Sequence, residues 1–340
     1  MPRILGLGLV ALDLIVEHYD DHRRVLLGGG GTCANVLAIL ACSGWEASLA
    51  GALDESAWSE LMRQDLEHAG VETKGVRRQV GATPSLIVEH LARTGDAKGQ
   101  HWFQPYGSGE GDWPGLYAAP DNAVQGAAPS LPGQDVLFVD RLSAEVLQLA
   151  RRAKAQGTVV VYEPSTRQDR PWVSEMLGLA DVVKYSSERA GAIGLAAADV
   201  ETKLVLVTDG PRGVAWRLGG SAGDWLHQAA VRSPSIVDTC GAGDWFTAGL
   251  LMGLYGGPSG RQGAAVAPER VANAVKGAAV LAAWSCGFVG ARGALYDAQA
   301  PELKSRIDCA SPAKNRSRRK PSRPAVPAVY REEVLSLCRG

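Results

Sequence analysis

Two aspartates flank a turn of small residues in the segment VDTCGAGDWFTAG, residues 237–249. The turn Gly241-Ala242-Gly243 leaves backbone N–H groups unobstructed, and it runs into an apolar pattern typical of a helix, whose first N–H groups lack internal partners. Such donors, together with the helix dipole, stabilise a transferring phosphoryl group. Asp244 at the edge of this pocket is placed to accept a proton from an attacking hydroxyl. The segment therefore predicts phosphoryl transfer.

A structural interpretation of Asp244 stays open at this point. An aspartate at the start of a helix caps free amides and interacts favourably with the helix dipole. Capping, however, needs neither the second aspartate, Asp238, nor the Gly-x-Gly sequence between the two. The pattern favours a phosphate site over a simple cap.

The stretch DTCGAGD, residues 238–244, resembles the signature D-T-x-G-A-G-D of the ribokinase-like, or PfkB, family of carbohydrate kinases at every fixed position. The resemblance implies that Asp244 is the catalytic base and that the amides of Gly241, Ala242 and Gly243 form the anion hole. It implies that Asp238 is associated with a monovalent cation such as K⁺, or with water around the metal. ATP as phosphoryl donor and Mg²⁺ as cofactor are implied in the same way.

Segments near the N-terminus resemble the sugar-binding parts of that family. The matching residues are Gly30, Gly31 and Asn35 in GGTCANVLAILACSG and Asp13 in ALDLIVEH. Adjacent glycines let a polyhydroxylated ligand approach the backbone, and an asparagine both donates to and accepts from hydroxyls. A carboxylate inside an apolar strand needs partners, which sugar hydroxyls would supply. A glycine-rich turn before a helix is the alternative, and the additional Gly28 and Gly29 depart from the family pattern.

Later segments resemble the metal and nucleotide contacts of the family. In VVKYSSERA, Glu188 matches the glutamate that organises Mg²⁺, although Tyr185 stands where many members carry asparagine. The residues matching nucleotide contacts are Thr208, Gly210 and Gly213 in VLVTDGPRGVAW, Asn273 in VANAVKG, and Gly287 in SCGFVG. Each match alone also fits a solvated helix start or a β-turn. Their correct order between about residues 4 and 296 favours the family.

The elements that must position these residues follow an α/β order. Strand patterns such as TVVVY and LVLV are apolar on both faces, as in a parallel sheet covered by helices on both sides. We therefore expect an open, doubly wound, mostly parallel sheet. The resemblance makes this a ribokinase-like three-layer αβα fold over residues 1–300.

The segment from Ser85 to Gln104 breaks the α/β rhythm, because two alternating stretches flank a Gly-Asp-Ala-Lys-Gly turn and indicate a hairpin. With the strand after Asp13, it resembles the small β-sheet lid that these kinases close over the sugar, at about residues 13–27 and 84–104. A lid excludes water, which competes as phosphoryl acceptor. Because such lids often pair edge to edge, we expect a homodimer.

Composition narrows the partners and the location. The 340 residues include 35 Lys and Arg and 36 Asp and Glu, so the protein has no overall positive charge that would attract nucleic acid or an anionic membrane. No stretch is long and apolar enough to span a bilayer. The six cysteines lack metal or disulfide spacing, which predicts reduced thiols and a cytoplasmic protein.

The chain changes character from Pro301 onward. The segment 301–340 is basic, contains prolines and has few large apolar residues, so we expect a solvated, partly disordered tail with a short helix at VYREEVLSLCRG. The loop at residues 105–133, rich in proline, glycine and alanine, carries no functional prediction.

Three other functions compete with a sugar kinase. GLGLVA, residues 6–11, satisfies the weakest form of a dinucleotide fingerprint, but a strand pattern follows where that motif needs a helix. A nucleoside kinase of the same fold phosphorylates a ribose hydroxyl and stays open. So does a sensor that binds sugar or nucleotide without turnover, although the presence of Asp244 argues against it.

Overall fold

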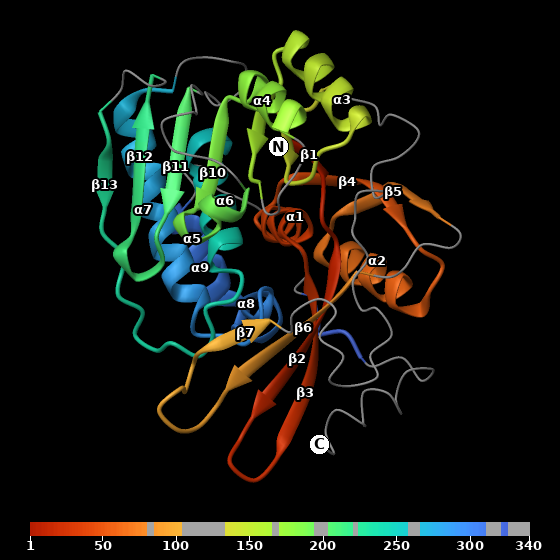
Figure 1. Ribbon diagram of the computed structural model, residues 1–340, viewed down its shortest axis with the longest axis vertical. Coiled ribbons are helices and arrows are strands. Elements are labelled where there is room, and N and C mark those ends of the chain that lie inside the picture. The colour runs from red at the N-terminus through yellow and green to blue at the C-terminus, as the bar shows by residue number, and fades with distance from the viewer. Residues whose placement is uncertain are drawn as a thin grey trace.

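The computed structural model describes residues 1–79, 85–103, 133–164, 170–193, 203–219, 224–257, 266–310 and 321–325. Within these ranges, nine strands form a central sheet in the order β13-β12-β11-β10-β9-β8-β1-β4-β5 (Figure 1). The strands are β1 (Arg3–Leu7), β4 (Glu46–Leu53), β5 (Glu72–Arg78), β8 (Val136–Val139), β9 (Val159–Tyr162), β10 (Val182–Ser186), β11 (Leu204–Thr208), β12 (Val214–Leu218) and β13 (Leu226–Gln228). All neighbours from β11 to β5 pair in parallel, and β12 and β13 are antiparallel at one edge. The predicted open, mostly parallel sheet is confirmed.

Helices cover both faces of this sheet. One face packs on α1 (Thr32–Cys42), α2 (Ala57–Ala69), α6 (Ala242–Tyr255), α7 (Pro268–Ser285) and α9 (Ala300–Ala310); the other packs on α3 (Ala144–Ala155) and α4 (Arg170–Leu179). The short helices α5 (Ser187–Ile193) and α8 (Gly293–Asp297) complete the described α-helices, and a 3₁₀ turn spans Gly210–Arg212. Successive strand residues join opposite cores: Ile4 and Phe138 point to the first, Leu5 and Val139 to the second. This double burial explains the apolar strand sequences.

A second sheet projects from the central one at the bottom of Figure 1. Among the described residues it contains four strands in the order β3-β2-β6-β7, namely β2 (Ala11–His18), β3 (Arg23–Gly30), β6 (Leu86–Ala92) and β7 (His101–Phe103). β6 and β7 pair antiparallel, as the predicted hairpin requires, and β2 pairs in parallel with β6. The small sheet lies where the sequence predicted a lid.

The structure contradicts a dinucleotide fingerprint at GLGLVA, as the strand pattern after it indicated. Gly6 lies in β1, and the chain passes from there directly into β2 rather than into a helix. A side chain at Gly8 would collide with Asp140, whose Oδ1 accepts a hydrogen bond of 2.8 Å from the Leu9 amide. These glycines therefore serve close packing at the end of β1.

The prediction of a solvated segment from Pro301 is wrong for residues 301–310. They belong to α9, which buries Leu303, Ile307 and Ala310 and contacts α6 and α7. The three apolar residues lie on one helical face, a spacing that average composition conceals. Farther on, Arg323 donates hydrogen bonds to the Val289 carbonyl at 3.0 Å and to the Asp297 carboxylate at 2.8 Å.

Two regions of the sequence predictions lie outside the described residues: the loop at 105–132 and the short helix expected at 329–340. Among the helices that are described, none combines the length and the apolarity that crossing a membrane requires.

Candidate active site

A cavity of about 1540 Å³ opens between the carboxyl ends of the central strands and the small sheet. It lies near β1, where the strand order reverses because β4 follows on one side and β8 on the other. Ligands of open α/β sheets bind at such reversal points. The cavity is therefore the candidate active site.

Gly241, which precedes α6, and Ala242 and Gly243, the first two residues of α6, all line this cavity. Gly241 adopts a φ of 74°, and a Cβ there would lie 2.5 Å from the Cα of Ala291, so only glycine fits without strain. The amides of Gly241 and Gly243 donate no hydrogen bond to any described residue, whereas the Ala242 amide reaches the Thr239 carbonyl at 3.3 Å. Two free amides thus remain at the head of α6, where an anion binds most favourably.

Asp244 lies in the first turn of α6, only 9% exposed, and also lines the cavity. Its Oδ2 accepts a hydrogen bond of 2.6 Å from Nδ2 of Asn35. Burial raises the pKa of Asp244 to about 7, and the neighbouring Glu163 carboxylate reinforces the rise, while the Asn35 hydrogen bond opposes it. A carboxyl group with such a pKa is suited to proton transfer near neutral pH.

Asn35 is the last member of a buried network of hydrogen bonds that holds the Asp244 carboxylate. Nε of Arg292 donates to the Asn35 Oδ1 at 2.8 Å, and the same guanidinium is paired with Asp65 on α2. The hydroxyl of Tyr296 in turn donates to Asp65 at 3.0 Å. Because Oδ1 of Asn35 accepts from Arg292, its amide group must face Asp244. The sequence singled out Asn35 but missed Arg292, Asp65 and Tyr296.

Glu163 and Lys184 were also missed by the sequence analysis. Glu163 follows β9 directly, and its carboxylate pairs with Lys184 of β10 and accepts a hydrogen bond of 2.6 Å from the Thr247 hydroxyl. Lys184 Nζ donates to the Gly243 carbonyl at 3.1 Å, so the ion pair holds the first turn of α6 in place. An acidic residue immediately after the buried run TVVVY was the available signal, because parallel strands point their carboxyl ends at the ligand site.

Three of the four predicted sugar contacts, Asp13, Gly31 and Asn35, line the cavity, whereas Gly30 does not. Asp13 is only 4% exposed; burial raises its pKa to about 7, and Arg292 opposes the rise. A Cβ on Gly30 would lie 2.0 Å from Oδ1 of Asp13, so this glycine leaves room for the carboxylate. The physical requirement for glycine at 30 is thus space for Asp13.

The predicted nucleotide contacts divide into two groups. Thr208, Gly210 and Gly213 line the cavity, and Gly213 has a φ of 103°. Asn273 and Gly287 do not line it. Asn273 is exposed on α7 about two helical turns before Ala279, which with Ala282 and Ala283 forms the part of α7 that faces the cavity.

The two predicted metal residues have different environments. Glu188 at the start of α5 is exposed and lines the cavity, an arrangement suited to Mg²⁺, which is held by one or two carboxylates together with substrate phosphates. Asp238 is 0% exposed and does not line the cavity. Its Oδ1 accepts from the Cys240 amide at 2.9 Å and its Oδ2 from the Gly290 amide at 2.7 Å. Asp238 therefore joins the turn before α6 to the loop before α8.

A mostly parallel sheet covered by helices on both faces, with a smaller separate sheet, defines a ribokinase-like fold, and the free amides at the head of α6 beside a buried carboxylate form a site suited to phosphoryl transfer. The pfkB family carbohydrate kinase profile matches residues 1–297. The chain belongs to this family and is a phosphotransferase with an alcohol group as acceptor.

Individual relatives agree with this assignment. A fructokinase from Klebsiella pneumoniae is 30% identical over 296 residues, which cover 78% of this chain and 89% of that protein. Two solved structures share the fold. A Burkholderia thailandensis nucleoside kinase in complex with inosine has a TM-score of 0.66 at 17% identity, covering 95% of this chain and 100% of that one. A fructokinase double mutant from Vibrio cholerae O395, with fructose, ADP and potassium bound, has a TM-score of 0.65 at 21% identity, covering 90% and 98%.

Proposed function

We propose that the chain transfers the γ-phosphoryl group of ATP to a hydroxyl of a sugar or sugar-like molecule, with Asp244 as base. One observation carries this proposal: the buried Asp244 carboxylate lies in the cavity at the head of α6, beside the free amides of Gly241 and Gly243. The complex of the Vibrio cholerae fructokinase with ADP and fructose supports this choice of donor and acceptor.

Each side chain has a defined part in the transfer. Asp13 accepts hydrogen bonds from acceptor hydroxyls, and Asn35 holds the Asp244 carboxylate in place. Asp244 takes the proton of the attacking hydroxyl as the new O–P bond forms. The amides at the head of α6 stabilise the negative charge that develops on the phosphoryl oxygens, and they need no reorganisation to do so.

Glu188 is the residue that would hold Mg²⁺, since its carboxylate is exposed in the cavity. When bound, Mg²⁺ supplies neutralisation of phosphate charge. A K⁺ ion near Asp238 stays a prediction, supported by the potassium in the Vibrio cholerae fructokinase. Because both oxygens of Asp238 accept backbone hydrogen bonds, its part in the proposal is to fix the turn before α6.

A free sugar is the favoured acceptor, because the relative at 30% identity is a fructokinase. A nucleoside is the second candidate, since a nucleoside kinase bound to inosine shares the fold. The lid predicted from sequence excludes water from either acceptor. A homodimer through the lid is supported by Trp102, which is exposed on β7, and a cytoplasmic location stays a prediction.

The proposal is tested by incubating the protein with ATP, Mg²⁺ and a panel of sugars and nucleosides while ADP release is followed. Release with one acceptor is the expected result, and its identity separates a sugar kinase from a nucleoside kinase. Asp244→Asn should keep the fold and lose turnover by about 10² or more. Unchanged turnover in this variant would remove the mechanism, and tight binding without ADP release would show a sensor.

A further inference from the structure

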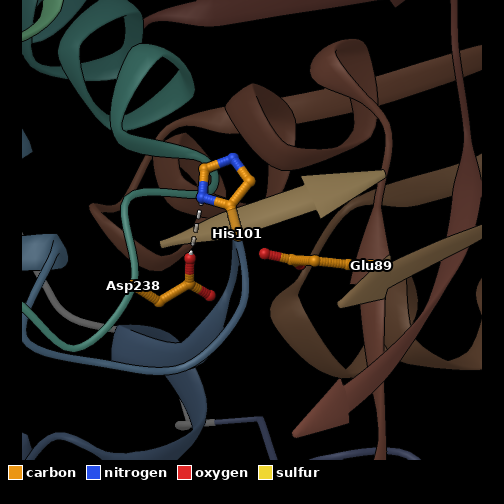
Figure 2. Close-up of side chains that lie close together, drawn as sticks. All are labelled: Glu89, His101 and Asp238. Atoms are coloured by element: carbon orange, nitrogen blue, oxygen red, sulfur yellow. Dashed lines mark ion pairs between the residues drawn. The ribbon is translucent and has the colours of Figure 1, made fainter. Parts of the chain in front are cut away.

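Three side chains that can bind metal converge where the small sheet meets the central domain. Glu89 comes from β6 and His101 from β7, and Figure 2 shows both near Asp238, which lies in the loop before α6. One donor atom from each residue lies within 4.8 Å of the other two. His101 Nδ1 is 3.5 Å from Oδ1 of Asp238 and 3.1 Å from the Thr239 hydroxyl. This group, called the Glu89 cluster below, is separate from Glu188.

Glu89 itself points to a missing partner. Its side chain is 0% exposed, and neither carboxylate oxygen has a well-formed hydrogen bond to a described residue. Burial raises the pKa of Glu89, and the carboxylates of Asp238 and Asp13 reinforce the rise. The Cys240 thiol and the Asp238 carboxyl group lie near enough to interact with Glu89, but a buried carboxyl group with no well-formed hydrogen bond is still costly, and a bound cation reduces that cost. The Glu89 and Asp238 carboxyl groups and the His101 imidazole thus lie within reach of a single ion.

We propose that the Glu89 cluster binds one divalent transition-metal ion of the Zn²⁺ type through the Glu89 carboxylate, Nδ1 of His101 and Oδ1 of Asp238. Imidazole with carboxylates is a donor set that Zn²⁺ accepts, whereas Mg²⁺ prefers oxygen ligands and retains water. Zn²⁺ bonds of about 2 Å in a tetrahedron hold ligand atoms about 3.3 Å apart. The observed 3.5 Å between His101 and Asp238 needs little movement to reach this value.

A bound ion at this position would also connect the small sheet to the central domain. Two ligands belong to the small sheet and one to the loop that leads into α6, so the ion bridges the sheet to the central domain. Such a bridge opposes opening, and opening is required for substrate entry and product release. The effect on turnover rests on the proposed kinase function, whereas the binding site does not.

Binding is tested on untagged full-length protein with an excess of Mg²⁺ present throughout. We expect Zn²⁺ to raise the melting temperature saturably, and Co²⁺ to give the visible absorption of a low-coordinate site with one ion per chain. His101→Ala and Glu89→Gln should each weaken both signals at least tenfold. His22→Ala, which alters an exposed histidine of the same sheet, is the matched control and should bind as the parent does.

Two results would overturn the site. One is parental Co²⁺ and Zn²⁺ binding by His101→Ala and Glu89→Gln. The other is loss of binding in His18→Asn, because it would place the ion on the His18 and His90 pair, whose ring nitrogens lie 2.9 Å apart. Turnover is then compared with and without Zn²⁺ at fixed Mg²⁺. Inhibition of the parent, relieved in His101→Ala, supports the bridge, and saturable binding without inhibition overturns it. A chain with no kinase activity leaves the Co²⁺ readout decisive for the site.

Discussion

Asn35 on α1 donates a hydrogen bond of 2.6 Å to the carboxylate of Asp244 on α6, across 209 residues of sequence. The other side of the Asn35 amide accepts from Arg292 at 2.8 Å. The orientation of the proposed base is therefore set by a buried guanidinium that does not touch it. This relationship connects the sugar side of the cavity with the head of α6.

The acid limb of the pH profile should report this hydrogen bond. Asp244 acts as base only when ionised, and with a pKa of about 7 its activity should rise with pH through neutrality. The Asn35 bond lowers that pKa, so Asn35→Ala should raise it and move the limb of kcat/KM to higher pH by roughly one unit. Gln64→Ala, on the exposed side of α2, serves as control. An unmoved limb with lower kcat/KM would mean that Asn35 only contacts the substrate.

Asp13 should make the protein less stable as pH rises. Its pKa is about 7 in the folded state against 3.8 for the unperturbed group, so the folded chain retains a proton that the unfolded chain releases. The free energy of unfolding therefore falls between about pH 4 and pH 7, by at most about 4 kcal/mol for this shift. In Asp13→Asn, the free energy of unfolding measured with urea should no longer show this part of the fall with pH. Asp96→Asn, in the exposed turn of the same sheet, should follow the parent, and parallel curves for all three proteins would refute the assignment.

The buried pair of Arg292 and Asp65 should be sensitive to loss of one partner. Asp65→Asn leaves a guanidinium that is only 2% exposed without its counter-charge, and we expect a loss of about 3–5 kcal/mol in the free energy of unfolding. Replacing both partners, with Arg292→Met and Asp65→Leu, should recover part of this loss. Arg63→Met breaks partly exposed pairs with Glu60 and Glu67 on the same helix and should cost under about 1 kcal/mol. Equal losses in Asp65→Asn and Arg63→Met would contradict the role of burial.

Replacing Gly241 with a larger residue should displace the amides at the head of α6 and lower turnover. Gly241→Ala adds a Cβ 2.5 Å from the Ala291 Cα at a φ of 74°, so the turn must move and its amides with it. Gly157→Ala is a matched control, because Gly157 has a φ of 76° and nothing within 4 Å of its Cβ position. Both variants should lose about 1–2 kcal/mol from the left-handed backbone, but only Gly241→Ala should lose turnover. Equal turnover in the two variants would show that the position of this turn does not matter.

Local sequence determined the alternation of strands and helices, the lid hairpin and the turn before α6. The apolar pattern of a strand, the small residues of a turn and the start of a helix are properties of neighbouring residues, which is why the segment 238–244 was interpretable alone. The prediction of Asn273 as a nucleotide contact shows the limit of such local evidence, because Asn273 does not line the cavity. Its segment fits the pattern, but the helix directs Ala279 and Ala283 into the cavity instead.

Only the tertiary structure decided which polar groups meet. Arg292, Asp65 and Asn35 come from three separate helical regions. Glu89 and His101 of the small sheet meet Asp238 of the loop before α6. Packing also made residues 300–310 a helix with one buried face, where composition indicated a solvated tail. Local pattern fixes elements, because it depends on backbone preference and periodicity. Long-range contacts depend on how those elements pack, which no single segment encodes.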